Sequence, residues 1–341
     1  MNEITTLRLH GESAADLAAA ADLLREGKLV AIPTETVYGL AANALDPAAV
    51  EGIFVAKARP HWDPLIVHVS DQAMLERVVS AVSPAARALM DAFWPGPLTL
   101  LLPRHAELPS AVTAGRELVG VRIPSHPVAQ ALLAAAGVPL AAPSANRFGH
   151  ISPTTAQHVL DDLDGRIHAV LDAGASDIGV ESTVFDPAAR MLYRQGGISQ
   201  RQIEDVLKAR ITVYQRREET QFKDTPESLP SPGVGMRHYA PGARVVLAYN
   251  QDDLRSHLLH LPPEQAGVLL PMGWQVPSFR GRIVPWEKWG DTPALARTLY
   301  SALRTLDEAG VTTIVCPLPS SSGDPLVEAI RDRLLKAARD V

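Results

Sequence analysis

Short apolar runs alternate with amphipathic helical patterns over the first two-thirds of the chain. Apolar residues three and four positions apart predict helices, whereas short apolar runs bounded by turn formers predict buried strands. The predicted helices cover 14–28, 46–59, 83–94, 126–137, 154–165 and 199–209. The predicted strands cover 29–33, 65–69, 98–103, 119–124, 138–143, 168–174, 182–187 and 191–196. This alternation predicts an α/β domain built on a mixed, partly parallel sheet.

The pattern changes after about residue 214. Residues 216–242 are polar, rich in proline and glycine, and without a clear period, which is typical of a linker. The end of this segment, "SPGVGMRHYAP", is unusual for a spacer because it concentrates Arg, His and Tyr. Strand-like runs then alternate with helical patterns, at 243–250, 266–272, 280–286, 293–310, 311–319 and 324–338. We therefore predict an α/β domain over 1–210, a linker over 211–242 and a smaller α/β domain with a parallel sheet over 243–341.

The overall charge limits the kinds of partner. The 341 residues carry a formal net charge of −6 and a pI near 6.0, so the chain does not coat nucleic acid by bulk charge. The single cysteine, Cys316, excludes an internal disulfide framework, and no Cys/His cluster has zinc-ligand spacing. No apolar run reaches the roughly 18 residues of a membrane helix, and the N-terminal stretch is unlike a signal peptide. These features predict a cytoplasmic protein with no membrane segment.

Common phosphate-binding and hydrolase motifs are absent from the sequence. It contains no GxxxxGKS/T loop, no GxGxxG after a predicted strand, no HExxH and no GxSxG. Polar residues gather instead at the ends of predicted elements. In "IPTETVYGL" Thr34 and Glu35 follow a strand directly, and the alternative interpretation is a polar turn with a capping box. In "KARPHWDPL" Lys57 and Arg59 stand at a helix end, where cations are favoured even without a ligand.

Arg122 lies inside the short apolar strand "VGVRIP". An unpaired charge would be costly there, so we expect it to meet an anion, the alternative being an internal salt bridge. Further along the chain are small polar side chains and one more cation, namely Ser144, Asn146, Ser152, Ser182, Thr183 and Arg194. The stretch "APSANRFGHISPTT" is also compatible with an ordinary turn.

Together these clusters supply the groups for one concave site. Lys57, Arg59, Arg122 and Arg194 can neutralise a polyphosphate and a carboxylate, while hydroxyls and an amide orient them. No activated nucleophile stands out, because Cys316 lies in the smaller domain and no Ser-His-Asp order is evident. We therefore expect chemistry by positioning and electrostatic stabilisation, as in phosphoryl or nucleotidyl transfer.

Six motifs resemble, in order and spacing, the YrdC-like domain. They are "IPTETVYGLAANA", "KARPHWDPLIVHV", "FWPGPLTLLLP", "VGVRIPSHP", "APSANRFGHISPTT" and "GVESTVFD". The segment "SPGVGMRHYAP" and the second domain resemble the two-domain Sua5 form of the threonylcarbamoyl-AMP synthase family, so the resemblance covers nearly the whole chain. It implies an α/β fold: a YrdC-like twisted mixed sheet with a concave site, a linker that closes over the site as a lid, and a smaller Rossmann-like C-terminal domain.

The resemblance implies a nucleotidyltransferase that forms threonylcarbamoyl-AMP and pyrophosphate from L-threonine, bicarbonate and ATP. Threonine and bicarbonate would give a carbamate, whose oxygen attacks the α-phosphate of ATP with Mg²⁺ bound to the phosphates. The product would pass to a tRNA threonylcarbamoyl transferase assembly for t6A modification. Direct binding of tRNA is expected to be weak or absent.

The resemblance also assigns roles to residues. Lys57 and Arg59 would hold the triphosphate as the catalytic cations, and the metal ligands are left open. The threonine side would consist of Thr34, His68, Arg122, Ala142 and Ser182. The ATP side would add Ser144, Asn146, Ser152, Arg194 and Tyr239. A histidine within "LIVHV" is also compatible with a plain core position.

The chain departs from the family pattern at a few positions. Ala173 stands where a glycine is more common, and Gln195 where a proline often follows the arginine. In the linker, Gly235 and Met236 replace a lysine and a tyrosine, which puts some lid contacts in doubt. Arg237, His238 and Tyr239 are retained.

Three other functions are compatible with a YrdC-like domain. An RNA-binding role would favour a basic surface, yet residues 1–210 hold 17 Lys and Arg against 23 Asp and Glu, a net charge of 17 − 23 = −6. A carbamoyl transferase of hydrogenase maturation would need zinc-finger cysteines, which a single cysteine cannot supply. The third is a paralogue that binds nucleotide without turnover, against which the intact Lys57, Arg59, Ser144 and Asn146 argue.

Overall fold

In the computed structural model, which describes residues 4–215, 231 and 240–338, most of the predicted alternation is present. The N-terminal helices are α1 (Ala14–Arg25), α2 (Pro47–Lys57), α3 (Gln72–Glu76), α4 (Pro84–Phe93), α5 (Pro127–Ala136), α6 (Ala156–Leu163) and α7 (Gln200–Leu207), with a short 3₁₀ turn at Ser110–Thr113. Side chains just ahead of the helices fix where they begin. Ser13 accepts a hydrogen bond from the backbone N–H of Asp16, and Asp46 accepts from those of Ala48 and Ala49.

The N-terminal strands form one mixed sheet of eleven strands within the described residues. In sheet order they are β1 (Leu7–His10), β8 (Ala169–Asp172), β2 (Val30–Ile32), β3 (Gly39–Asn43), β7 (Leu140–Ala141), β4 (Ile66–His68), β6 (Leu118–Arg122), β5 (Leu98–Pro103), β9 (Thr183–Asp186), β10 (Met191–Arg194) and β11 (Thr212–Val213). Strands β4 and β6 are parallel and pair His68 with Arg122, whereas β9 and β10 are antiparallel. The pairing therefore places two polar side chains next to each other at the carboxyl ends of two central strands.

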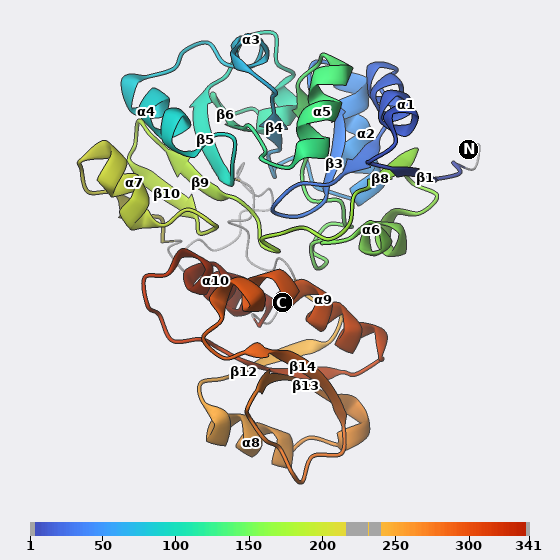
Figure 1. Cartoon of the computed structure of the whole chain (residues 1–341), viewed down its shortest axis with the longest axis vertical. Helices are drawn as coiled ribbons and strands as arrows, with labels where there is room; N and C mark the ends of the chain where they lie inside the picture. Colours follow the sequence, from blue (N-terminus) through green and yellow to red (C-terminus); the bar gives the residue numbers. More distant parts are fainter. Residues whose placement is uncertain (1–3, 216–230, 232–239, 339–341) are drawn as a thin grey trace.

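The C-terminal part is a second, smaller α/β unit. Its sheet has the order β12 (Arg244–Ala248), β15 (Thr313–Pro317), β13 (Ala266–Met272) and β14 (Arg282–Lys288). All of its pairings are parallel, which confirms the predicted parallel sheet. The helices are α8 (Gln251–Leu259), α9 (Thr292–Glu308) and α10 (Pro325–Ala337), with a 3₁₀ turn at Pro263–Gln265. Helices α9 and α10 lie between the small sheet and the N-terminal part (Figure 1).

Some elements are not apparent from the sequence pattern. Strand β3 is built from Gly39–Asn43, residues of low strand propensity, and it forms because β2 and β7 pair with it on either side. Helix α3 and the edge strand β1 are short. Strand β11 falls within the range expected as linker and pairs with β10 of the large sheet.

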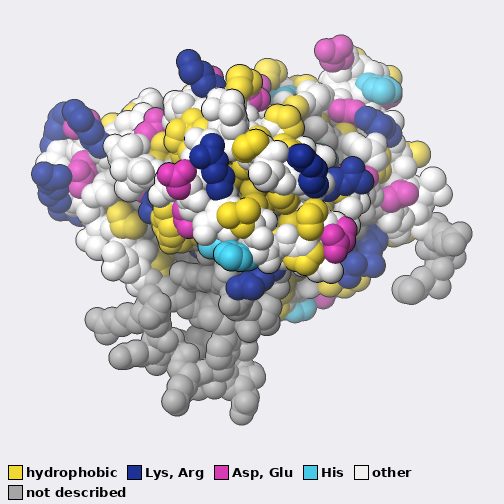
Figure 2. Space-filling model, turned by 90° about the horizontal axis from the view of Figure 1, so that it is seen from below, with side chains coloured by type: hydrophobic (Ala, Val, Ile, Leu, Met, Phe, Trp, Pro, Cys, Tyr) yellow, Lys and Arg dark blue, Asp and Glu magenta, His cyan; other side chains and the backbone are white. Residues whose placement is uncertain are grey.

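The end of the C-terminal part that lies farthest from the large sheet has a mixed surface. Lys and Arg side chains alternate there with Asp, Glu and hydrophobic side chains (Figure 2). None of the helices in the described ranges combines the length and apolar character needed to cross a bilayer.

Candidate active site

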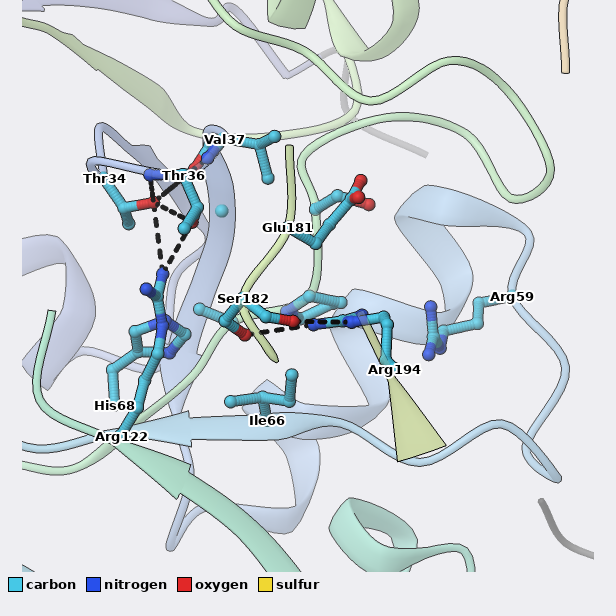
Figure 3. A pocket seen from close by; sticks show the side chains of 14 residues that line it. Thr34, Thr36, Val37, Arg59, Ile66, His68, Arg122, Glu181, Ser182 and Arg194 are labelled. Carbon is cyan, nitrogen blue, oxygen red and sulfur yellow. Dashed lines mark hydrogen bonds between the residues drawn. The ribbon is translucent and has the colours of Figure 1, made fainter. Parts of the chain in front are cut away.

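A cavity opens beside the turn that connects β2 to β3 and the ends of β4, β6 and β10 (Figure 3). The side chains that line it are mainly polar and cationic. They belong to Thr34, Thr36, Val37, Gly39, Arg59, Ile66, His68, Arg122, Ala142, Pro143, Ser144, Glu181, Ser182 and Arg194. The sequence clusters from six separate stretches of chain therefore meet in one place.

Arg122 is the centre of the hydrogen-bond network at one end of the cavity. Its Nη1 donates to Oε1 of Glu35 at 2.5 Å, and its Nε donates to Nε2 of His68 at 2.9 Å. Its Nη2 donates to the hydroxyls of Thr34 and Thr36, at 3.2 and 3.0 Å. These four bonds use four of the five N–H groups of the guanidinium, which leaves one for a further acceptor among the described residues. The internal salt bridge that we considered as the alternative is present, and Arg122 also faces the cavity.

His68 is held neutral beside this guanidinium. Burial lowers the pKa of His68 well below its usual value, and the positive charge of Arg122 lowers it further. A neutral imidazole can accept the hydrogen bond from Arg122 through Nε2. His68 is therefore an acceptor that helps to orient Arg122.

Thr34 closes the polar turn after β2. Its hydroxyl accepts hydrogen bonds from the backbone N–H groups of Thr36 and Val37 and donates to the carbonyl oxygen of Val37 at 2.6 Å. The turn leads into strand β3, so the capping-box interpretation is wrong at this position. The turn presents the Thr34 and Thr36 hydroxyls to the same face of the cavity as Arg122 (Figure 3).

Arg194 and Ser182 form a second cluster at the other side. Arg194 Nε donates to the carbonyl oxygen of Ser182 at 2.9 Å, and its Nη2 donates to the Ser182 hydroxyl at 3.1 Å. The hydroxyls of Ser182 and Thr99 are 2.8 Å apart. Strands β5 and β9 are parallel neighbours, which brings Thr99 of β5 next to Ser182, the residue before β9. The hydrogen bond between the two hydroxyls orients the Ser182 side chain.

Lys57 and Arg59 lie at the end of α2 and are buried. The ammonium of Lys57 donates to the backbone oxygens of Ser144 and Asn146, which ties the helix end to the loop after β7. Burial, with the nearby charge of Arg59, lowers the pKa of Lys57 well below its usual value. Arg59 pairs with Asp63, with 2.9 Å between Nη2 and Oδ2, and reaches the cavity.

Most of the predicted residues converge on this cavity. Those that line it are Thr34, Arg59, His68, Arg122, Ala142, Ser144, Ser182 and Arg194. Lys57, Asn146 and Ser152 are buried but are not among the lining residues. Tyr239, predicted on the ATP side, lies outside the described residues, as do Gly235, Met236, Arg237 and His238.

Sequence reasoning did not assign roles to Glu35, Thr36, Thr99 and Glu181. Glu35 and Glu181 were visible within "PTET" and "VEST", but their partners are far away in the sequence. In the part of the chain that the structure describes, no three His, Cys, Asp or Glu side chains are grouped so as to hold a metal ion.

The chain is similar to known proteins over nearly its whole length. The family model Sua5_yciO_yrdC, described as "Telomere recombination", matches residues 22–196, and Sua5_C, described as "Threonylcarbamoyl-AMP synthase, C-terminal domain", matches 198–339. The threonylcarbamoyl-AMP synthase of Bacillus subtilis is 42% identical over 328 residues, 94% of this chain and 92% of the relative. That of Pyrococcus abyssi is 40% identical over 329 residues, 94% of this chain and 93% of the relative. The crystal structure of P. abyssi Sua5 complexed with L-threonine superposes with a TM-score of 0.86 at 37% identity, covering 98% of this chain and 97% of that one.

Proposed function

The chain belongs to the Sua5 family of threonylcarbamoyl-AMP synthases, and we propose that it forms threonylcarbamoyl-AMP for the t6A modification of tRNA. The observation that carries this function is the similarity to such synthases along both parts of the chain, at 42% identity to the B. subtilis enzyme. The cavity fits the reaction because it combines arginines with small hydroxyl side chains. An enzyme of this type is a nucleotidyltransferase.

The reaction needs little covalent help from the protein. The amine of L-threonine combines with bicarbonate to give a carbamate and water. A carbamate oxygen then attacks the α-phosphorus of ATP, the bond to the β-phosphate oxygen breaks, and pyrophosphate leaves. The protein's part is to align the two substrates and to stabilise charge on the phosphates.

The threonine side of the site is proposed around Arg122. A guanidinium with one N–H still available suits a carboxylate, and the Thr34 hydroxyl lies against it. The similar P. abyssi Sua5 structure is a complex with L-threonine, which supports threonine as a substrate of this chain. Ala142, Ser182 and His68 complete the proposed threonine side.

The ATP side is proposed along Arg59, Ser144 and Arg194. These residues line the cavity, and the two arginines can carry phosphate charge. Lys57 and Asn146 are assigned to the same side, and Lys57 holds the loop after β7 by donating to the backbone oxygens of Ser144 and Asn146. Tyr239 remains a proposed ATP contact from the linker.

We propose the remaining features from the chemistry of the reaction. ATP enters as its Mg²⁺ complex, because this ion is usually held by phosphate oxygens and waters. We propose a catalytic domain at 1–210, a linker and lid at 211–242 and a C-terminal domain at 243–341; the two separate sheets support the two domains, while β11 extends the large sheet to Val213. The product passes to the tRNA threonylcarbamoyl transferase assembly in the cytoplasm, and tRNA binds this chain weakly or not at all.

Mass spectrometry of the reaction products tests the function. The purified full chain is incubated with ATP, Mg²⁺, bicarbonate and threonine, beside reactions that lack threonine or bicarbonate. We expect an adduct of threonine, carbonate and AMP that needs both substrates, is lost in Lys57→Ala and persists in Lys28→Ala, a matched change at an exposed lysine. A folded wild-type chain that binds ATP and yields no such adduct would contradict the proposal.

A further inference from the structure

Helices of the C-terminal part pack against the loops of the N-terminal part that carry residues of the site. Figure 1 shows α9 and α10 facing the large sheet. Val37, Ile151 and Val180 of the N-terminal part are buried in the same apolar cluster as Leu299 of α9 and Ile330 of α10. The two parts of the chain thus share a continuous core at this boundary.

A buried carboxylate lies where the two parts meet. Glu181 is 6% exposed and lines the cavity beside Ser182 (Figure 3). Its Oε2 accepts hydrogen bonds from Arg333 Nε at 2.8 Å and from the Tyr300 hydroxyl at 3.0 Å. Its Oε1 accepts from the Ser152 hydroxyl at 2.5 Å. Glu181 therefore connects α9 and α10 to a serine assigned to the ATP side.

The charges around Glu181 keep it ionised. Burial alone would raise its pKa, but the positive charges of Arg333 and Arg194 and the hydrogen bonds from Ser152 and Arg333 lower it to about 2. A buried charge of this kind depends on its partners, because removal of one partner leaves the other uncompensated. The ion pair with Arg333 is thus part of what fixes the carboxylate in place.

Two further bonds from the C-terminal part reach neighbouring loops. Arg333 Nη1 donates to the carbonyl oxygen of Gln195 at 2.9 Å, next to Arg194. Arg304 Nη2 donates to the carbonyl oxygen of Ile151, next to Ser152. The loops that carry Ser152 and Ser182, and the end of β10 at Arg194, are therefore each held at the adjacent residue by α9 or α10.

The loop before Glu181 touches α9 without space for a side chain. Gly179 has a φ of +81°, and a Cβ built there would lie 2.4 Å from Cα of Arg297 and 2.6 Å from the carbonyl oxygen of Ala296. Glycine is required here both for the backbone conformation and for the close approach. The contact leaves α9 little room to move relative to the loop.

We propose that Tyr300 and Arg333 are positioning residues of the nucleotide side: through Glu181 they set the direction of the Ser152 hydroxyl, and Arg333 also holds the backbone next to Arg194 at the carbonyl oxygen of Gln195. The C-terminal domain then contributes to the adenylation site by orienting residues of the N-terminal domain. This rests on the proposed function only in naming ATP as the ligand of that side. The pair of Arg122 and Glu35 at the threonine side receives no side-chain bond from α9 or α10 within the described residues.

The test compares two variants of the full chain with a control on the same helix. Tyr300→Phe removes one hydroxyl, and Arg333→Gln removes the charge at Glu181. Arg331→Gln is the control, because the hydrogen bond and the ion pair of Arg331 in α10 go to Pro319 and Glu328, both in the C-terminal part. The dissociation constant of ATP is measured by calorimetry without threonine, and the KM values for ATP and threonine are measured from product formation.

We expect Arg333→Gln to weaken ATP binding roughly tenfold or more, as for the loss of a hydrogen bond to a charged group, and Tyr300→Phe to weaken it several-fold. The KM for threonine should change less than about twofold, a split that a general loss of stability would not produce. Glu181→Gln combined with Arg333→Gln should recover part of the lost affinity, because no uncompensated carboxylate remains.

The inference is overturned if folded Tyr300→Phe and Arg333→Gln bind ATP as the wild type does, or if Arg331→Gln shows the same loss. It is also overturned if the KM values for ATP and threonine rise in parallel. If Arg333→Gln does not fold, Tyr300→Phe and the double variant decide. A wild-type chain that binds ATP but makes no threonylcarbamoyl-AMP would contradict the proposed function, while the calorimetric comparison would still test the positioning role.

Discussion

Replacement of Arg122 by Gln removes the charge at the centre of the threonine side. Arg122 is 4% exposed, and so is its partner Glu35. Loss of one member of such a buried ion pair costs about 3–5 kcal/mol, because the remaining carboxylate keeps its desolvation penalty. If Arg122 also binds the substrate carboxylate, loss of that charge-assisted bond, about 1.5–3 kcal/mol, should raise the KM for threonine roughly 10- to 150-fold.

Two assays on the same samples separate these effects. Urea unfolding gives the free energy of unfolding, and product formation at saturating ATP gives the KM for threonine. The double variant Glu35→Gln/Arg122→Gln removes both charges, so it should recover part of the stability lost in Arg122→Gln but none of the threonine affinity. A double variant no more stable than Arg122→Gln, or an unchanged KM for threonine in Arg122→Gln, would refute the reasoning.

Three further predictions concern other parts of the site. Lys57→Met should lower the free energy of unfolding by about 1–3 kcal/mol for each backbone carbonyl, of Ser144 and Asn146, that loses its donor, and it should abolish product formation. A variant that is as stable as the wild type in urea unfolding and still forms the product would contradict this. Gly179→Ala and Gly174→Ala both place a side chain at a positive φ, which costs about 1–2 kcal/mol. Only the Cβ at position 179 would also meet the backbone of α9, so Gly179→Ala should have a clearly lower melting temperature than Gly174→Ala. Equal decreases in melting temperature would argue against the close contact. The pKa of Glu181 falls from 4.5 to about 2 on folding, so its ionised form stabilises the native state at pH values above the unfolded-state pKa. This contribution to stability disappears as the pH falls from the unfolded-state pKa to the folded-state pKa. The advantage of wild type over Glu181→Gln in urea unfolding should therefore shrink as the pH falls from about 5 to about 2, and a constant advantage would disprove the linkage.

Much of the fold could be predicted because local signals and packing agree. Helix α1 begins at Ser13 and helix α2 at Asp46, since each side chain caps its own helix, and both signals can be read in the sequence. Strand β3 could not be predicted, because glycine and alanine become a strand there only through pairing with β2 and β7. Tertiary context decides such elements.

The site was predictable to a similar degree. Arg122 could be singled out because a charge within an apolar strand needs a partner, and His68 meets it because β4 and β6 pair in register. The partner Glu35 lies 87 residues away and Arg333 lies 152 residues from Glu181, so neither pairing leaves a local pattern. The contribution of the C-terminal domain depends on those long-range contacts.

Each of the three arginines that line the cavity lies near a carboxylate of the chain itself, and Glu181 also pairs with Arg333. Arg59 pairs with Asp63, Arg122 pairs with Glu35, and the charge of Arg194 acts on Glu181. Buried charges without such partners would oppose folding, so this matching allows the site to exist before the substrates bind. It also means that an incoming triphosphate does not meet a large excess of positive charge at the residues that line the cavity. Selectivity for ATP and threonine must then come from the direction of individual N–H and O–H donors, and the carboxylates that orient those donors are as important to the reaction as the arginines themselves.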